Sequence, residues 1–333
     1  MAKHASSHNS TPILTFDQPL YYKALQIIKS EPENSALKGI VLRLRGLHCL
    51  MSFLGSIGHL MANTGLHEVL EIIYARNTIE HMMSGKAISR AIRGHLIVDA
   101  VLNGLLLKKA LKELTASSTA NQHFSREGSE VPIVSESPVS TEELDQVTIA
   151  SSVEVQVPGE LLQGEMEEAY QQMMDGKPVE DLFHSEVVQK TKELLDSQKA
   201  NVNASRTAKL WIQYMKTVDI LKQFLRAERL GNWHQHLHAT KQMLPFFAAS
   251  GHNHYLKSSY MYLQEMNDLE TTHPDVYFHF CNGLHVVRRS DRHWAGLSTD
   301  LVIEQCLMRN LKSTGGLTHG SGMTESQRSQ WVL

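Results

Sequence analysis

Apolar residues recur at helical spacing along most of this 333-residue chain, and this pattern constrains its fold more than any other feature. Leu66, Val69, Leu70 and Ile73 are one example, because spacings of three and four residues place side chains on one face of a helix. The same pattern returns between residues 205 and 283. Only two short apolar runs near the N-terminus are typical of buried strands. We therefore predict a mainly α-helical protein.

The first 60 residues carry the strand signals. Apolar runs at 12–16 and 40–44 predict two strands, each followed by a helical pattern, so the predicted order is strand, helix, strand, helix. Asp17 directly follows the first run. In open α/β sheets, ligands bind at the carboxyl ends of strands, so Asp17 is a candidate metal ligand and catalytic residue. The alternative is a helix N-cap, because Asp just before a Pro in a first helical turn is a common capping arrangement.

The composition changes abruptly after residue 114. The next residues are rich in Ser, Thr, Glu and Val, contain three prolines and show no sustained periodicity, which predicts a disordered linker. The predicted organisation is a partial α/β core (1–60), a helical segment (61–114), the linker (115–160), two acidic helices (161–200), a helical insertion (205–283) and a terminal segment (284–333) with a helix and a Gly-rich tail.

Composition and charge narrow the class of protein. Apolar residues make up 42% of the chain, enough for a sizeable core, and the three widely spaced cysteines match no disulfide or zinc framework. No run of about 18 uncharged apolar residues occurs and the first ten residues are polar, so we expect no membrane span and an intracellular location. The net charge of -3 divides unequally: residues 125–200 carry -12 and the remainder +9. The remainder therefore favours an anionic partner, and the alternative is a solvated acidic linker beside ordinary surfaces.

Two further groups of residues are candidates for chemistry. Asp300 and Glu304 are four residues apart at the start of an apolar helical pattern, so they share a helix face. The alternative is a purely structural role, because the helix dipole stabilises acidic side chains in a first turn. A basic cluster precedes them, and arginines beside a tryptophan suit phosphate contact and base stacking, with a solvated Arg–Asp network as the alternative. The cluster consists of Arg288, Arg289, Arg292 and Trp294.

Histidines are frequent, and three of them alternate in one segment. His234 and His238 are one helical turn apart, with His236 between them. Two histidines at this spacing can share a metal, but the spacing specifies no third ligand and the HExxH pattern is absent. The pattern therefore favours structural histidines over a zinc site.

Five strings in the chain resemble transposon-derived proteins of animals and fungi, a group of uncharacterised open reading frames present in many copies. The strings are LTFDQPL (14–20), GLHCLMSFLG (46–55), VVRRSD (286–291), WAGLSTDLVIEQ (294–305) and GGLTHG (315–320). The resemblance covers nearly the whole chain outside 115–160. It implies a partial RNase H-like core interrupted by helices, as in DDE-type transposases.

The resemblance also implies a site. Asp17 would be the second catalytic acid and Glu304 the third, with Asp300 as a further metal ligand and His48 as an additional site residue; Mg²⁺ or Mn²⁺ held by the acids would activate water or a 3′-hydroxyl. Only 16 residues precede Asp17, so the first acid is absent and we expect a truncated remnant without full activity. The implied partner is DNA and the implied location nuclear. The alternative is a helical interaction protein, a homo-oligomer or one with a protein partner.

Overall fold

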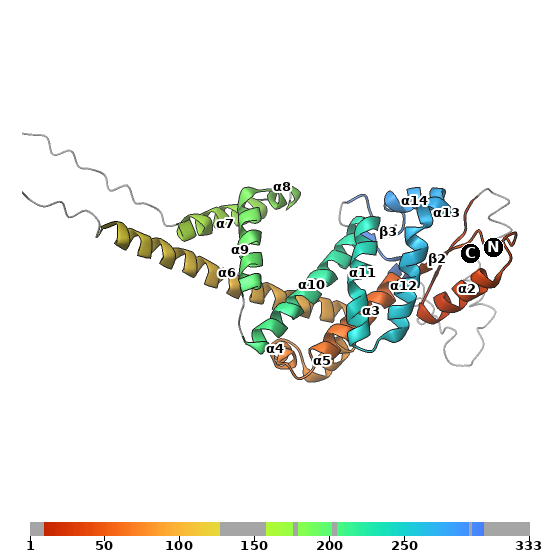
Figure 1. The fold of residues 1–333 in the computed structure, drawn as a ribbon, viewed down its shortest axis with the longest axis horizontal. Coiled ribbons are helices and arrows are strands. Elements are labelled where there is room, and N and C mark those ends of the chain that lie inside the picture. The colour runs from red at the N-terminus through yellow and green to blue at the C-terminus, as the bar shows by residue number, and fades with distance from the viewer. Residues whose placement is uncertain (1–9, 127–157, 176–178, 202–204, 293–294, 303–333) are drawn as a thin grey trace, which may run out of the picture. The chain divides into compact units, whose positions relative to one another are not determined.

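The computed structural model describes residues 10–126, 158–175, 179–201, 205–292 and 295–302. The chain divides into two compact units, one formed by residues 1–98 with 213–333 and the other by residues 99–212. Most of the described residues are helical, which confirms the predicted fold class at this level (Figure 1). Among these residues, no helix combines the length and the apolar character needed to cross a bilayer.

The first unit begins with a short parallel strand pair. Strand β1 pairs with β2 from Ile13 opposite Val41 to Phe16 opposite Leu44, and helix α2 connects the two strands. Tyr21 and Leu25 of α2 are buried in the core. The elements are β1 (Ile13–Phe16), α2 (Gln18–Ser30), β2 (Val41–Leu44), α3 (Gly46–Leu60), α4 (Leu66–Glu71) and α5 (Arg76–Met83).

The second half of this unit is a run of helices that packs on the strand pair. Helix α11 lies beside both α12 and α3, and α12 also contacts α2 and β2. Trp233, Tyr262 and Phe280 fill the core between these helices and the strands. The elements are α10 (Arg206–Leu230), α11 (Trp233–Ala249), α12 (Asn253–Asn267), α13 (Leu269–Thr272), α14 (Pro274–Cys281), β3 (Val287–Arg288), β4 (Gly296–Leu297) and α15 (Thr299–Val302).

The second unit is helical and includes the acidic helices predicted from the sequence. It contains most of α6 and the first residues of α10 together with three helices between them. The helices are α6 (Ile88–Arg126), α7 (Pro158–Met174), α8 (Val179–Phe183) and α9 (Glu186–Asn201).

Two boundaries differ from the sequence prediction. Helix α6 continues to Arg126, into the segment predicted as linker, because extending a formed helix by one residue costs far less than starting a new one, even through the Ser/Thr-rich residues 115–119. The second predicted acidic helix is divided into α8 and α9, and Ser185 at the break donates its hydroxyl to the carbonyl of Leu182. The rest of the predicted linker, 127–157, lies outside the described residues.

Candidate functional site: a buried Glu-His-His cluster

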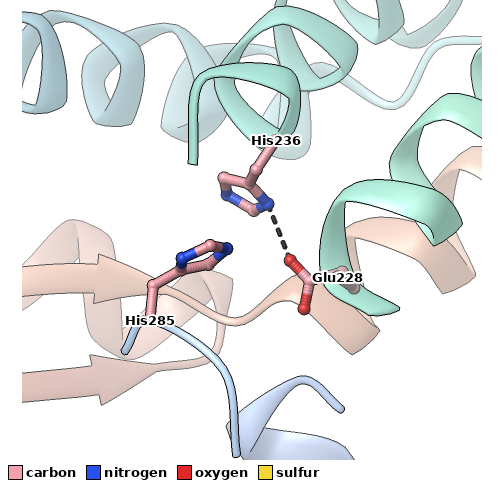
Figure 2. Close-up of side chains that lie close together, drawn as sticks. All are labelled: Glu228, His236 and His285. Carbon is pink, nitrogen blue, oxygen red and sulfur yellow. Dashed lines mark ion pairs between the residues drawn. The ribbon is translucent and has the colours of Figure 1, made fainter. Parts of the chain in front are cut away.

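Three metal-ligating side chains meet inside the first unit. Glu228 comes from the last turn of α10, His236 from the first turn of α11, and His285 from the connection between α14 and β3 (Figure 2). Their ligating atoms all lie within 4.8 Å of one another, and among the described residues this is the one cluster of three or more such groups. The cluster therefore brings together three segments that are separate in the sequence.

Helix periodicity turns two of these side chains inward. Glu228 lies on the same face of α10 as Leu221 and Phe224, and all three are buried. His236 shares the buried face of α11 with Met243. A polar or ionisable residue thus occupies a core position on each helix.

Two tight turns bring the three segments together. Gly231 separates α10 from α11, and Gly283 lies just after α14; both adopt positive φ. A Cβ built on Gly231 would lie 3.0 Å from the Cα atom of Gly283, so the two turns cross backbone against backbone. This crossing holds the segment with His285 against the corner that carries Glu228 and His236.

The cluster is buried and incompletely hydrogen-bonded. Glu228, His236 and His285 are 6%, 2% and 0% exposed. His236 Nδ1 lies 2.7 Å from Glu228 Oε1, whereas Glu228 Oε2 and His285 Nε2 have no hydrogen-bond partner among the described residues. Buried polar atoms are almost always hydrogen-bonded, so these two atoms require an explanation.

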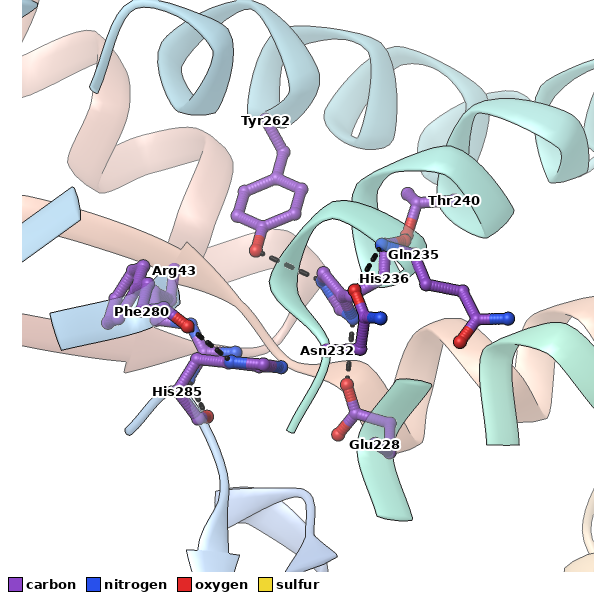
Figure 3. Close-up of polar contacts among 9 residues, drawn as sticks. All are labelled: Arg43, Glu228, Asn232, Gln235, His236, Thr240, Tyr262, Phe280 and His285. Atoms are coloured by element: carbon purple, nitrogen blue, oxygen red, sulfur yellow. Dashed lines mark hydrogen bonds and ion pairs between the residues drawn. The ribbon is translucent and has the colours of Figure 1, made fainter. Parts of the chain in front are cut away.

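The other nitrogen of each histidine is held from outside the cluster. His285 Nδ1 lies 3.3 Å from the carbonyl oxygen of Phe280, to which its N–H can donate. His236 Nε2 lies 3.2 Å from the hydroxyl of Tyr262 (Figure 3). Each imidazole thus has one nitrogen fixed by a neighbour and the other directed into the cluster. Metal-ligating histidines are usually held in this way.

The surroundings of Glu228 include a guanidinium and the N-terminus of a helix. Arg43 of β2 donates from its Nη1 atom to the carbonyl oxygen of His285, at 2.5 Å, and its guanidinium lies 5.2 Å from the ring centre of Phe280. The first turn of α3 approaches from another side, since a Cβ built on Gly46 would lie 3.4 Å from Glu228 Oε2. A guanidinium and a helix N-terminus both stabilise a buried carboxylate.

These surroundings set the protonation states. Burial by itself raises the pKa of the Glu228 carboxyl, but the contact with His236 and the charge of Arg43 outweigh it, so the pKa lies below its ordinary value. Burial lowers the pKa of His285 to about 3. Burial raises the pKa of Tyr262 to about 12. At neutral pH the cluster therefore holds a carboxylate and a neutral His285, the forms that bind metals.

The residues that the sequence singled out for metal binding lie elsewhere or outside the described part. Asp17 caps α2: its Oδ1 accepts from the backbone N–H of Leu20 at 3.3 Å, the contact expected under the capping alternative. Glu304 lies outside the described residues, and Asp300 is described in its backbone alone, within α15. His48 is half-buried in the first turn of α3.

The basic cluster forms part of a short hairpin. Strands β3 and β4 are antiparallel, and Arg288, Arg289 and Arg292 are exposed. Arg288 donates from Nη2 to the carbonyl oxygen of Arg292 at 2.9 Å, so part of its hydrogen-bonding capacity serves the turn. Trp294 lies outside the described residues.

The comparison with protein families gives one result that covers the whole sequence. A family model described as a domain of unknown function, DUF8702, matches residues 1–333. The chain belongs to the DUF8702 family. No curated protein and no solved structure matches it.

In this DUF8702 chain, sequence reasoning singled out the histidine segment 234–238 but favoured structural histidines there, and it did not predict the cluster. It considered His234 and His238, which are exposed, whereas His236 between them is the buried ligand candidate. The available signal was the helix face, because His236 is in register with the apolar Met243. Glu228 is likewise in register with buried apolar residues of α10. No spacing rule points to His285, because it lies in the connection between α14 and β3 and not on a helix.

Proposed function

We propose that this protein binds one divalent transition-metal ion, with zinc as the best fit, through Glu228, His236 and His285. The observation that carries the proposal is that three ligand atoms from three buried segments converge while Glu228 Oε2 and His285 Nε2 have no hydrogen-bond partner among the described residues. An ion at the centre would satisfy both atoms. The protein would then be a metal-stabilised helical domain.

The donor set favours zinc over magnesium. Imidazole nitrogens suit zinc, copper, nickel and iron, whereas Mg²⁺ prefers oxygen ligands in an octahedral arrangement. Two of the three donors here are imidazoles, and the contacts of His285 with Phe280 and of His236 with Tyr262 are of the kind that orient zinc ligands. The Mg²⁺ or Mn²⁺ implied by the family resemblance would instead require the acids at Asp17 and Glu304.

The burial of the cluster supports a structural role for the ion. Zinc–nitrogen bonds of about 2.05 Å in a tetrahedron place neighbouring ligand atoms about 3.3 Å apart, so binding would shorten the longest separations in the cluster and lengthen the 2.7 Å contact between His236 Nδ1 and Glu228 Oε1. A catalytic zinc needs a position open to substrate. Three protein ligands would leave the fourth tetrahedral position to a water molecule, but all three ligands are buried, so we infer that the ion would act by joining α10, α11 and the His285 segment.

The test is metal content together with stability, on protein freed of any histidine tag. The expected result is about one zinc per chain by mass spectrometry after dialysis against micromolar zinc, and a melting temperature that falls on chelation. With free zinc about a thousandfold above Kd, the folded state gains about 4 kcal/mol. Cobalt substitution should give the visible absorption of a tetrahedral site.

Matched variants assign the ion to the cluster. Glu228→Gln keeps the side-chain shape and removes the charge, so zinc content should fall at least about tenfold. His238→Ala removes an exposed histidine from the same helix and should leave zinc content unchanged. A wild-type protein that takes up no zinc and melts at the same temperature with and without chelator would contradict the proposal. The cluster would then be an ion network in which Arg43 balances Glu228.

A second proposed function is contact with DNA, in keeping with the resemblance to transposon-derived proteins. The observation that favours it is the exposure of Arg288, Arg289 and Arg292 within one hairpin. The parallel pair of β1 and β2, with Asp17 directly after β1, is compatible with a partial RNase H-like core. If DNA is not bound, the alternative of a helical interaction protein takes its place.

A further inference from the structure

A surface hollow lies between α11 and α12, apart from the buried cluster. The two helices pack side by side and are joined by a short turn (Figure 1). The hollow measures about 320 Å³, at the lower end of the range for small-molecule sites. It is lined by His234, Leu237, His238, Lys241, Leu244, Tyr260, Leu263, Gln264 and Asn267.

One wall of the hollow is basic. His234, His238 and Lys241 follow one another at spacings of four and three residues, which places them on one face of α11. Among the described residues, no carboxylate lines the hollow and none forms an ion pair with Lys241. His234 is turned toward Cys281, with Nε2 3.7 Å from Sγ, so His238 and Lys241 are the groups left for a ligand. An anion is the complementary charge.

The opposite wall is polar and uncharged. Tyr260, Gln264 and Asn267 have the same spacing on α12, so an aromatic ring and two amides face the basic wall. Three leucines of the lining supply apolar contact between the walls. The hollow thus offers the ammonium group of Lys241 and the imidazole of His238 for an anionic group, and an aromatic and apolar surface for a flat ring attached to that group.

We propose that this hollow binds an organic phosphate, with the phosphate against His238 and Lys241 and a flat ring against Tyr260 and the leucines. The amide of Gln264 can donate a further hydrogen bond to the phosphate. The proposal does not depend on metal binding, because His236 and Tyr262 on the same two helices are buried on their inner faces.

The experiment is a calorimetric titration of the full-length protein with adenosine 5′-monophosphate, adenosine and inorganic phosphate. The monophosphate should bind with a Kd of about 0.1–1 mM, and the other two at least about tenfold more weakly, because each lacks one half of the contact. Absence of binding by the monophosphate at millimolar concentration would overturn the proposal. Equal affinity for inorganic phosphate would also overturn it, because the ring would then contribute nothing.

Variants separate this hollow from general surface charge. Lys241→Met keeps most of the apolar stem and should weaken the monophosphate about tenfold, since a hydrogen-bonded charge is lost. Lys257→Met is the matched control: Lys257 lies on α12, contacts Tyr22 and does not line the hollow. The Lys257→Met variant should bind the monophosphate with the same affinity as the wild-type protein. If both variants bind the monophosphate equally well, the assignment to the hollow is wrong.

Discussion

His95 gives the clearest pH-dependent property of a single residue. It is completely buried on α6, with Nδ1 2.9 Å from the hydroxyl of Tyr214, and Nε2 has no hydrogen-bond partner among the described residues. Burial lowers its pKa from 6.5 to about 4. Below pH 6.5 the unfolded chain binds a proton that the folded protein excludes, so stability is complete above pH 6.5 and falls as the pH drops toward 4.

The expected size follows from this shift. Because the unfolded chain takes up a proton at His95, lowering the pH from 7.5 to 5 should decrease the free energy of unfolding by about 2 kcal/mol. His95→Phe should flatten this slope in urea unfolding measured at several pH values, although it loses some stability at pH 7.5 because the Tyr214 hydroxyl loses a partner. His238→Ala, an exposed control, should keep the wild-type slope. An unchanged slope in His95→Phe would show that His95 is not the group responsible.

At the residue level, sequence predicted local contacts better than convergent ones. The capping alternative for Asp17 matches its contact with the backbone N–H of Leu20, and Asn232 accepts a backbone N–H of α11 in the same way, because capping depends on only three or four successive residues. The Glu228–His236–His285 cluster depends on two chain reversals. One candidate ligand, His236, was visible as part of a histidine series, but Glu228 and His285 could be named beside it only once the turns were placed.

At the level of elements, the crossing of Gly231 and Gly283 controls the site. Gly231→Ala places a methyl group against the backbone of Gly283, in addition to the cost of positive φ, which is about 1–2 kcal/mol for Ala. Gly251 has nearly the same φ, 73° against 71°, and a Cβ there would meet no atom within 4 Å. Gly251→Ala therefore reproduces the strain without the clash.

This pair of variants tests how the crossing serves the cluster. Both should lower the melting temperature, but Gly231→Ala should in addition lose zinc at least about tenfold more readily in a competition with a chelator, because His285 is displaced from Glu228 and His236. Mass spectrometry of the metal content gives the second reading. Equal zinc retention in the two variants would show that the crossing does not position the ligands.

The helices of the first unit were largely predictable because their apolar faces are regular. The periods of α11 and α12 each point to one buried side, whereas α10 is buried over more than half of its circumference, and turns with Asn or Gly separate the three helices. The sequence located the end of α6 less well: Thr and Ser residues favour caps and turns locally, yet a helix already formed continues through them. The sequence indicated a brief extended piece at 285–288, where β3 lies, but not its pairing with β4, because two-residue strands have no period.

For the whole molecule, the separation of charge along the chain sets the expectation for DNA. Residues 125–200 carry a net charge of -12 and the remainder +9, and the exposed arginines of the hairpin belong to the first unit. An anionic polymer should therefore be attracted to the first unit and repelled by the acidic segment. Binding should be strongest at low salt, because released counterions contribute most there.

The combined change of Arg288, Arg289 and Arg292 to Gln should weaken binding of duplex DNA. If each arginine neutralises one phosphate, the slope of log K against log salt should become less negative by about 2–3, at roughly 0.9 per contact. The control removes equal charge from exposed positions of α6, by changing Lys108, Lys109 and Lys112 to Gln. Fluorescence anisotropy over a salt series measures both. An equal loss of DNA affinity in the two triple variants would indicate attraction to net charge alone. If the wild-type protein binds no DNA at low salt, the helical interaction protein is the alternative that remains.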